Sequence, residues 1–520
     1  MKQIGFKNFR KFKEFPSMTL APITIFVGEN NAGKSTVVKG ILALSDFLNE
    51  TNQNSFRFLD DMFDEGDSFE QRNAKLLNEI NFNFNTSYLA HIGTFKRAIY
   101  NKAKEDTITF YADLGLLRIS VKVKGDRHNE EAVSGKVTLL NINITQYNID
   151  MIIDIESDEA TLVFNPKPHK NKKSQSTTDK INNYFKEIKE KIVFHTSISA
   201  NWIPYNRMLI QSFIEMFERL INATIANASS ANKFISVYNW QDEPVFDNIS
   251  DENLDFLLRI VDIISPNSMT ANSMVAKFSF MNRKDNRFYS RMADIEYLYA
   301  HSVSQTVLYS SKDTNDYLSR TIHEFAPYQE IKHKRQFILK WMREFGIGKD
   351  FEIKSVGGEA HIVYIVNNDG EKVNLADKGM GSIQLMVLLF RFAIRLPFEE
   401  VIDTKDIDFT DKVIIIEEPE QNLHPMLQSK LADLFYELSC IFRYKFIIET
   451  HSEYLIRKTQ VIVSERYNTD EKLKDNPFKV YYFPSNDVPY EVVYRPNGRF
   501  ENDFGKGFFD EAANLSFKLF

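Results

Sequence analysis

The chain has 520 residues, of which 43% are hydrophobic, and its formal net charge is −7. About three domains of roughly 150 residues fit this length, and the hydrophobic content is sufficient for a sizeable core. The acidic balance argues against a strongly basic nucleic-acid-binding protein, and the single cysteine, Cys440, excludes an intramolecular disulfide framework and a cysteine zinc ribbon.

The N-terminal stretch MKQIGFKNFRKFKEF mixes basic and aromatic residues and contains no apolar segment of the kind that a signal peptide needs. The longest apolar stretch, residues 383–397, is interrupted by Arg391 and Arg395, which are costly at the centre of a membrane-spanning helix. We therefore expect a cytoplasmic protein without a membrane span.

Residues 22–44, PITIFVGENNAGKSTVVKGILAL, read in order as a strand, a glycine-bounded loop and a helix. The loop matches G-x-x-x-x-G-K-[ST], the motif in which backbone N–H groups and a helix N-terminus surround a phosphate chain. Lys34 would neutralise the β- and γ-phosphates, and Ser35 would bind Mg²⁺. The motif predicts a site for ATP and Mg²⁺, and its expected contacts are Gly28, Asn30, Asn31, Gly33, Lys34, Ser35 and Thr36.

Between residues 80 and 164, apolar and polar residues alternate in the segments INFNFN, TITFYADLGLLRISVKV, KVTLLNINIT and IDMIIDIE. A period of two with polar segments between the runs predicts an antiparallel β-meander. Residues 165–180 are rich in proline, lysine and serine and predict an exposed linker. We assign residues 75–165 to this β-lobe.

From residue 182 to 345 the pattern is mainly helical and lacks the sustained heptads of a long coiled coil. Basic residues recur at helical spacing in 331–348, beside Phe337 and Trp341. A helix with its apolar face on the core and its Lys and Arg side chains in solvent explains this pattern, and contact with nucleic acid is the second interpretation. Residues 180–348 are therefore predicted to form a helical lobe.

The apolar run at 413–416 ends in two adjacent acids, Glu417 and Glu418. A continuous β-branched run is typical of a strand buried on both faces of a parallel sheet. A P-loop needs acids at the end of such a strand, one to support Mg²⁺ and one to polarise the attacking water. We assign the first role to Glu417 and the second to Glu418, while an ordinary strand end is the alternative for this pattern taken alone.

Two further segments flank this strand. NLADKGMGSIQLMVLLFRFAI places Ser382 near the start of an apolar helix, and KFIIETHSEYLIRK is another buried strand followed by His451. The interval from Glu418 to His451 is about the length of one strand-helix-strand unit, with the helix expected at 425–440.

Together these motifs resemble the nucleotide-binding head of ABC-type ATPases, in the branch of the SMC-, Rad50-, RecF- and OLD-like proteins. The resemblance implies an α/β P-loop NTPase fold with an inserted antiparallel β-lobe and a helical lobe, and a core formed by residues 1–50 and 350–465. It also implies that residues 381–384 match the signature motif, through which Ser382 and Gln384 contact the nucleotide of the opposite subunit, and that Arg10 or Lys11 lies near the base. Catalysis would fall to Lys34, Glu418 and His451, the last matching the switch histidine, and residues 422–425 match the D-loop.

The C-terminal residues 466–520 are expected to form a short tail element without a Toprim nuclease. Its segment GFFDE, residues 507–511, resembles the tail of bacterial ABC-type ATPases from defence operons. In physical terms, Phe508 and Phe509 predict an aromatic plug that docks the tail onto the head.

Three functions fit the sequence. The first is the ATPase subunit of a bacterial anti-phage defence or DNA-maintenance complex, a homodimer or higher oligomer that works with a separate effector such as a nuclease, and with nucleic acid as a further candidate partner. The second is an ATP-gated scaffold or sensor with very slow hydrolysis. The third is a self-contained metal-dependent nuclease that uses Asp503, Asp510 and Glu511.

Overall fold

The computed structural model describes residues 2–49, 81–85, 92–113, 117–144, 149–154, 159–164, 191–195, 295–298, 306–310, 312–313, 316–396, 412–505 and 507–518. The predicted linker at 165–180 and the helical pattern at 196–294 lie outside this range. The chain divides into two units, one formed by Met1–Leu20 and Ser35–Asp294 and the other by Ala21–Lys34 and Ile295–Phe520. Each unit is described by itself.

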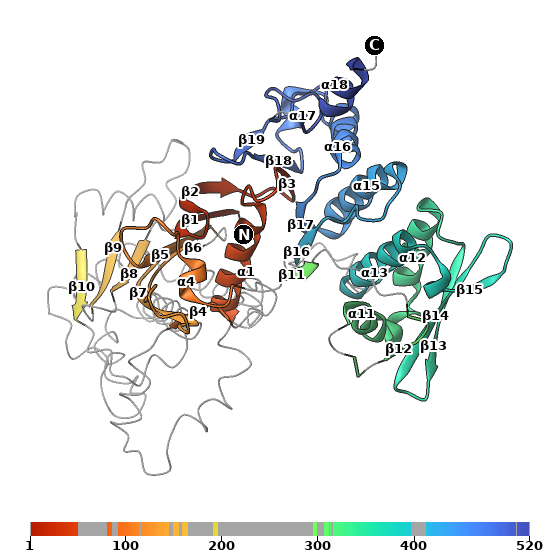
Figure 1. The fold of residues 1–520 in the computed structure, drawn as a ribbon, viewed down its shortest axis with the longest axis horizontal. Helices are drawn as coiled ribbons and strands as arrows, with labels where there is room; N and C mark the ends of the chain where they lie inside the picture. The colour runs from red at the N-terminus through yellow and green to blue at the C-terminus, as the bar shows by residue number, and fades with distance from the viewer. Residues whose placement is uncertain are drawn as a thin grey trace, which may run out of the picture. The chain divides into compact units, whose positions relative to one another are not determined.

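The first unit contains an antiparallel sheet in the order β10-β9-β8-β7-β6-β5-β1-β2, with β4 paired to β7 (Figure 1). Its strands are β1 (Gln3–Phe9), β2 (Phe12–Thr19), β4 (Asn81–Asn83), β5 (Thr107–Asp113), β6 (Leu117–Lys124), β7 (Ser134–Ile144), β8 (Ile149–Asp154), β9 (Glu159–Phe164) and β10 (Lys191–His195). The predicted β-meander is confirmed. The sheet also takes in the N-terminal hairpin, because β1 pairs with β5, and β10 lies in a range that was expected to be helical.

Helix α1 (Lys34–Asn49) follows the P-loop, and the short helix α4 (Phe95–Ala98) precedes β5. A Cβ on Gly40 of α1 would lie 2.4 Å from a ring carbon of Phe6, so the helix packs closely on β1. Phe82 stacks on Phe110, with ring centroids 4.7 Å apart, and on Phe47 of α1, at 5.0 Å. Aromatic packing therefore holds α1 against this sheet.

The second unit is built on a sheet in the order β11-β16-β17-β3-β18-β19, parallel except for β19. Its strands are β11 (Ile295–Leu298), β16 (Lys412–Glu417), β17 (Tyr444–Glu449), β3 (Ile23–Gly28), β18 (Phe478–Phe483) and β19 (Tyr490–Val492). The strands predicted around 413–416 and before His451 are confirmed. Two others correct the predicted boundaries: β11 comes from the range assigned to the helical lobe, and β18 from the range assigned to the tail.

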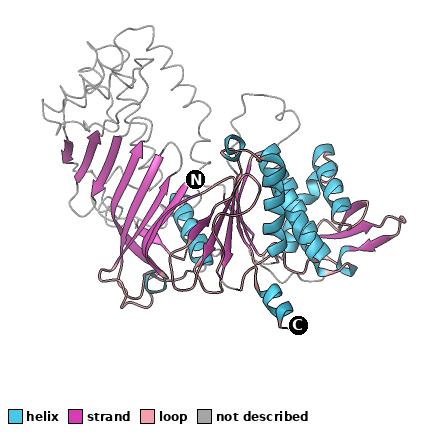
Figure 2. Ribbon diagram, turned by 90° about the horizontal axis from the view of Figure 1, so that it is seen from above, coloured by secondary structure: helices cyan, strands magenta, loops and turns pink. Residues whose placement is uncertain are grey.

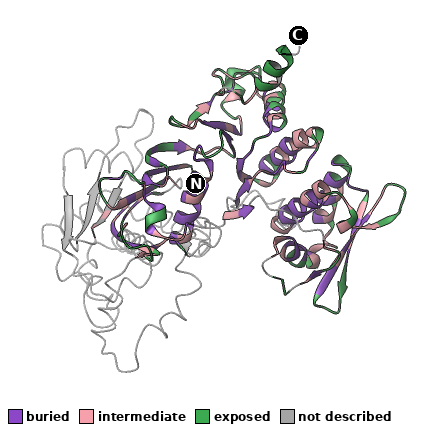
Figure 3. Cartoon of the chain, in the orientation of Figure 1, coloured by how far each residue is buried: buried purple, intermediate pink, exposed green. Residues whose placement is uncertain are grey.

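The longer helices of this unit are α11 (Tyr317–Phe325), α12 (Lys332–Glu344), α13 (Met380–Arg395), α15 (Pro425–Phe442) and α16 (Glu453–Arg466). Helices α17 (Asp470–Leu473) and α18 (Glu511–Phe517) are short, as are the 3₁₀ turns Ala326–Tyr328 and Leu375–Asp377. Helix α15 packs on β17 and β3. Helices lie beside the parallel strands in Figure 2, and most of α13 is buried (Figure 3). The predicted helices at 425–440 and after the GMGS turn are confirmed. No helix among the described residues combines the length and apolarity of a membrane span.

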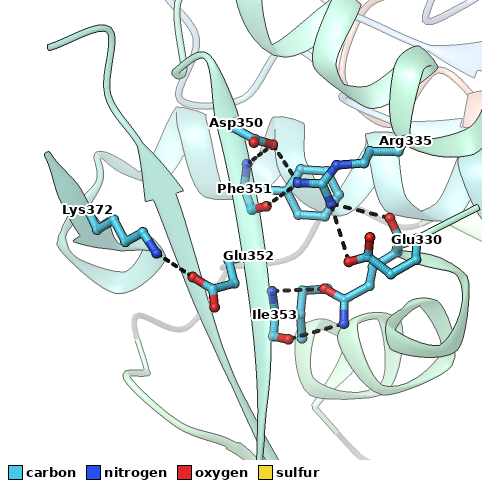
Figure 4. Close-up of polar contacts among 8 residues, drawn as sticks. Glu330, Arg335, Asp350, Phe351, Glu352, Ile353 and Lys372 are labelled. Atoms are coloured by element: carbon cyan, nitrogen blue, oxygen red, sulfur yellow. Dashed lines mark hydrogen bonds and ion pairs between the residues drawn. The ribbon is translucent and has the colours of Figure 1, made fainter. Parts of the chain in front are cut away.

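A smaller antiparallel sheet of the same unit consists of β12 (Tyr309–Ser310), β14 (Ala360–Val366) and β13 (Asp350–Val356), with β15 (Lys372–Asn374) also paired to β14. The side chains of Gln329, just before α12, and of Arg335 in α12 bind backbone groups of β13, and Figure 4 shows the bonds of Arg335. The Gln329 amide donates to Ile353 O at 3.2 Å and accepts from Ile353 N at 3.1 Å, and Arg335 donates to Phe351 O and to Asp350 Oδ1. These bonds satisfy groups on a strand edge that would otherwise invite further pairing.

Helix α12 confirms the predicted apolar face, since Phe337 and Trp341 are buried. One of its basic residues corrects the expectation that all of them lie in solvent, because Lys334 is only 1% exposed. Its ammonium donates to the carbonyl oxygens of Ala393 at 2.6 Å and of Leu396 at 2.8 Å. Lys334 thus satisfies backbone groups that the C-terminus of α13 leaves free.

The tail docks as an aromatic cluster. Phe504 lies within 5.0 Å of Phe508 and 4.5 Å of Phe509, and both Phe504 and Phe508 contact Tyr482 of β18. Arg457 of α16 lies over the Phe509 ring at 4.2 Å. The predicted aromatic plug is therefore confirmed, and it packs on the strand next to β3.

Candidate functional site

The P-loop leaves β3 at Gly28 and turns through backbone angles that favour glycine. The φ values are 138° at Gly28, 59° at Asn31 and 110° at Gly33. A Cβ at Gly28 would lie 2.2 Å from the carbonyl oxygen of Phe483, the last residue of β18. Gly28 is thus required by its φ and by a neighbouring strand, a reason that the loop motif alone did not provide.

Lys34 is buried at the end of this loop, with 3% of its surface exposed. Its ammonium donates to the carbonyl oxygens of Gly28 and Glu29, each at 3.0 Å, and lies 3.9 Å from Glu449 Oε1. Burial lowers the pKa of Lys34, while the charges of Glu449 and Glu418 raise it. Neutral carbonyls are its closest partners, so this cation suits a phosphate chain that brings its own negative charge.

The acids of the site meet at the carboxyl edge of the parallel sheet. Glu417 ends β16 and pairs in register with Glu449 of β17, which in turn pairs with Phe26 of β3. Adjacent parallel strands therefore place these carboxylates beside the P-loop, as ligand sites in such sheets require. Glu449 is buried and Glu417 half-buried.

Glu418 follows directly and adopts a φ of 46°. This left-handed conformation costs a non-glycine residue roughly 1–2 kcal/mol. It is held by a backbone hydrogen bond from Glu418 N to Glu449 O at 2.7 Å, and its carboxylate accepts a bond from Gln421 Nε2 at 2.5 Å. Backbone strain that its neighbours enforce is a feature of functional positions.

His451 is the second residue after β17, and its backbone N–H donates to Glu420 Oε1 at 2.7 Å. Partial desolvation and the nearby Lys34 lower the pKa of His451, and the charge of Glu418 raises it. Because an ordinary histidine pKa is about 6.5, the lowered value makes the imidazole mostly neutral at pH 7. A neutral ring can accept one hydrogen bond and donate another.

The start of α13 packs against the loop that follows Glu418. Gln384 Nε2 donates to Pro419 O, and Asn422 Nδ2 donates to Gln384 Oε1, both at 3.4 Å. Gly381 lies closer still, since a Cβ there would be 2.5 Å from Asn422 O. The signature-like segment is therefore in contact with the D-loop-like segment of the same chain.

The second unit contains most of the predicted site residues. They are Gly28, Asn30, Asn31, Gly33, Lys34, Glu417, Glu418, Ser382, Gln384 and His451. Ser35 and Thr36 open α1 in the first unit, and Arg10 occupies the β1–β2 turn of that unit with a φ of 49°. The nucleotide and metal contacts of all the predicted site residues stay predictions.

Two acids escaped the sequence analysis. Glu420 and Glu449 are both buried. Glu449 ends an apolar run, the same signal that identified Glu417, and Glu420 lies three residues after Glu417. Neither could be assigned from its spacing alone, because their burial depends on contacts between β16, β17 and the P-loop.

Comparison with protein families matches residues 1–456 to the AAA ATPase domain. The chain belongs to this ATPase family. Its P-loop, its strand-end acids and its α/β architecture with several sheets accord with that membership, and the protein is a P-loop ATPase.

The search of curated proteins found no match to the ATPase. Among solved structures it is similar to an Smc head domain from Pyrococcus furiosus bound to the C-terminal domain of ScpA, at 13% identity, covering 100% of this chain and 98% of the other with a TM-score of 0.31. It is also similar to the SMC head domain from Thermotoga maritima, at 9% identity, covering 95% and 98% with a TM-score of 0.34.

The close approach at Gly381 gives a direct test of the α13 contact in the ATPase. In Gly381→Ala the new methyl would meet Asn422 O at 2.5 Å and Leu423 Cδ2 at 3.0 Å, so the helix or the loop must shift. We expect kcat to fall about tenfold, equivalent to about 1.4 kcal/mol in the barrier. ATP affinity should hold, since the P-loop is untouched.

Gly379→Ala is the matched control, because no atom lies within 4 Å of a Cβ at that position. Its kcat should stay within about twofold of the unmodified ATPase, the range of most surface substitutions. Steady-state ATP hydrolysis of both variants checks this, and equal activities would show that the contact is dispensable.

Proposed function

We propose that this ATPase hydrolyses MgATP between two copies of the chain, as the cytoplasmic ATPase subunit of a bacterial anti-phage defence or DNA-maintenance complex. The observation that carries the hydrolytic part is Glu418. Its carboxylate follows the strand β16, is held in a strained conformation by Glu449 and Gln421, and acts electrostatically on both Lys34 and His451. A base so placed is suited to orient and deprotonate an attacking water.

Within one copy, Lys34 and the N–H groups of the P-loop would hold the phosphate chain, and Glu418 would accept the proton of the water. His451, mostly neutral at pH 7, would donate a hydrogen bond to the phosphate oxygens, and Arg10 would lie near the base. Ser382 and Gln384 of a second copy would complete the site. The hydrogen bonds of Gln384 with Pro419 and Asn422 connect the signature segment of one copy to the loop after Glu418 in the same copy.

Ser35 and Glu417 would hold Mg²⁺, and their hydroxyl and carboxylate oxygens are the ligand types that this ion prefers. When bound, the ion would neutralise charge that develops on the phosphate oxygens. Glu417 is one methylene longer than the aspartate usual at this position, which favours contact through water.

The proposed partners are a second copy of the chain and a separately encoded effector such as a nuclease, with nucleic acid as a further candidate. The effector proposal rests on the tail element Gly507–Glu511, which resembles tails of ATPases from defence operons. The described residues contain no cluster of three His, Cys, Asp or Glu side chains that could hold a metal ion. The nuclease alternative within this chain stays a hypothesis.

One observation favours the alternative of a slow ATP-gated sensor. The bond from Gln421 Nε2 occupies one acceptor site of Glu418 Oε2 and fixes the carboxylate, so a water must approach one of its remaining acceptor sites. A chain in which the fixed carboxylate keeps water from those sites would bind ATP and hydrolyse it very slowly.

Turnover as a function of protein concentration tests the proposal. If two copies share each site, the specific activity should rise with concentration and level off, and a sizing experiment should show a larger species in MgATP than without nucleotide. Specific activity that is constant over a hundredfold range of concentration, with no change in size, would contradict shared sites. Binding without turnover at every concentration would favour the sensor.

A further inference from the structure

Glu420 is a buried acid that has no role in the proposed reaction as described above. It lies in the turn after β16, two residues beyond Glu418, and is 8% exposed. One oxygen, Oε1, accepts the backbone N–H of His451 at 2.7 Å. The other, Oε2, has no hydrogen-bond partner among the residues that the structure describes.

A carboxylate is a costly choice at such a position. Burial raises the pKa of Glu420, and the hydrogen bond from the His451 N–H lowers it. Removing a carboxylate from water is unfavourable unless its bonds compensate, and an apolar side chain of similar volume often stabilises a fold equally well. Stability is therefore a poor reason for Glu420, and its bond to His451 is the better one.

This bond is one of several that connect the ends of β16 and β17. Glu418 N donates to Glu449 O at 2.7 Å, so residues 418–420 are joined to residues 449–451 at two points. Next to them, Gln428 of α15 accepts from the Ser452 hydroxyl at 2.6 Å and donates to Leu423 O at 3.0 Å. The backbone at His451 is thereby held against the turn that carries Glu418.

We propose that Glu420 is a positioning residue for ATP hydrolysis, which holds His451 in register with Glu418 through the His451 backbone. The roles of His451 and Glu418 in this inference rest on the proposed function. Glu420 itself need not touch nucleotide or water, and its contribution is the distance that it sets between the two side chains. A displacement of about 1 Å in such an arrangement can cost about 100-fold in rate.

Two substitutions test the length of the Glu420 side chain and its charge separately. Glu420→Gln keeps the length of the side chain and an oxygen that can accept the His451 N–H, while it removes the charge. Glu420→Asp keeps the charge and draws the carboxylate back by one methylene, about 1.5 Å. We expect kcat to stay within about threefold in Glu420→Gln and to fall about 10- to 100-fold in Glu420→Asp. Binding of a fluorescent ATP analogue should be unchanged in both.

The same pair in a His451→Ala background provides the readout that a purely structural role would not move. If Glu420 acts through the imidazole, Glu420→Asp should lower kcat no further once the imidazole is gone. An equal loss of kcat in Glu420→Gln and Glu420→Asp, an undiminished effect in His451→Ala, or lowered unfolding temperatures with unchanged kcat would each overturn the inference.

Glu418→Gln, measured beside these variants, distinguishes a failure of the Glu420 inference from a failure of the proposed function. If Glu418→Gln abolishes turnover and Glu420→Asp does not lower it, the inference about Glu420 fails while the proposed function stands. If turnover is indifferent to Glu418→Gln, the proposed function fails, whatever the Glu420 variants do.

Discussion

Replacing Glu418 with glutamine should abolish steady-state ATP hydrolysis while nucleotide binding persists. The amide matches the carboxylate in size and can keep an oxygen for the bond from Gln421, but it cannot accept the proton of the attacking water. General-base catalysis contributes typically about 10²- to 10⁴-fold, so kcat should fall by that factor. The P-loop and Lys34 are unchanged, and the affinity for ATP should remain within about threefold.

Phosphate release and equilibrium binding of a fluorescent ATP analogue measure the two quantities. If two copies share each site, as proposed, Glu418→Gln should accumulate an ATP-bound dimer in a sizing experiment, because the hydrolysis that would release the two copies is blocked. Glu471→Gln, an exposed glutamate at the start of α17, is the matched control and should behave like the unmodified ATPase. Turnover in Glu418→Gln that stays within threefold of the unmodified rate would remove Glu418 from the catalytic role.

Replacing Lys34 with alanine should remove ATP binding and, with it, turnover. Lys34 is 3% exposed and supplies the only buried ammonium described in the P-loop. Losing one member of a buried charged pair costs about 2–5 kcal/mol in binding, which corresponds to a loss of affinity of roughly 30- to 4000-fold. Titration of the fluorescent ATP analogue gives the affinity, and Lys474→Ala, at an exposed position, is the control.

Lys34→Ala should also lower the stability of the fold, and this effect can be measured separately from the loss of ATP binding. The substitution leaves Glu449 buried without the cation 3.9 Å away, and the carbonyl groups of Gly28 and Glu29 without their donor. An unsatisfied buried group costs about 1–3 kcal/mol, so the free energy of unfolding should fall by about that amount. Adding Glu449→Gln should restore part of this stability without restoring ATP binding. Full recovery of binding in the double variant would contradict a direct role for Lys34.

The motifs that could be recognised in the sequence share one property: each is formed by residues that are close together along the chain. The P-loop consists of consecutive residues, the strand β16 is a run of β-branched residues, and α15 begins at a proline and follows a helical period. The β-meander is likewise visible as alternation within each strand. Elements of this kind were predicted with nearly their observed bounds.

Strands β11 and β18 lacked such a signal. Each is short and lies within a range whose average pattern indicated something else, helix in one case and tail in the other. Each becomes a strand of the parallel sheet because it pairs with β16 or β3, which are far away along the chain. Pairing between distant segments depends on tertiary structure and not on periodicity.

The sequence by itself identified the candidate groups of this ATPase, namely a phosphate-binding loop, a lysine, two strand-end acids and a histidine, because each lies in or beside a motif of consecutive residues. The tertiary structure alone decided which groups approach them. It placed Phe483 against Gly28, the buried Glu449 beside Lys34, and Glu420 beneath the His451 N–H. The physical reason is that burial and close approach arise only when distant strands meet at one edge of a sheet. The residue pattern within a single strand does not show which strands will pair with it.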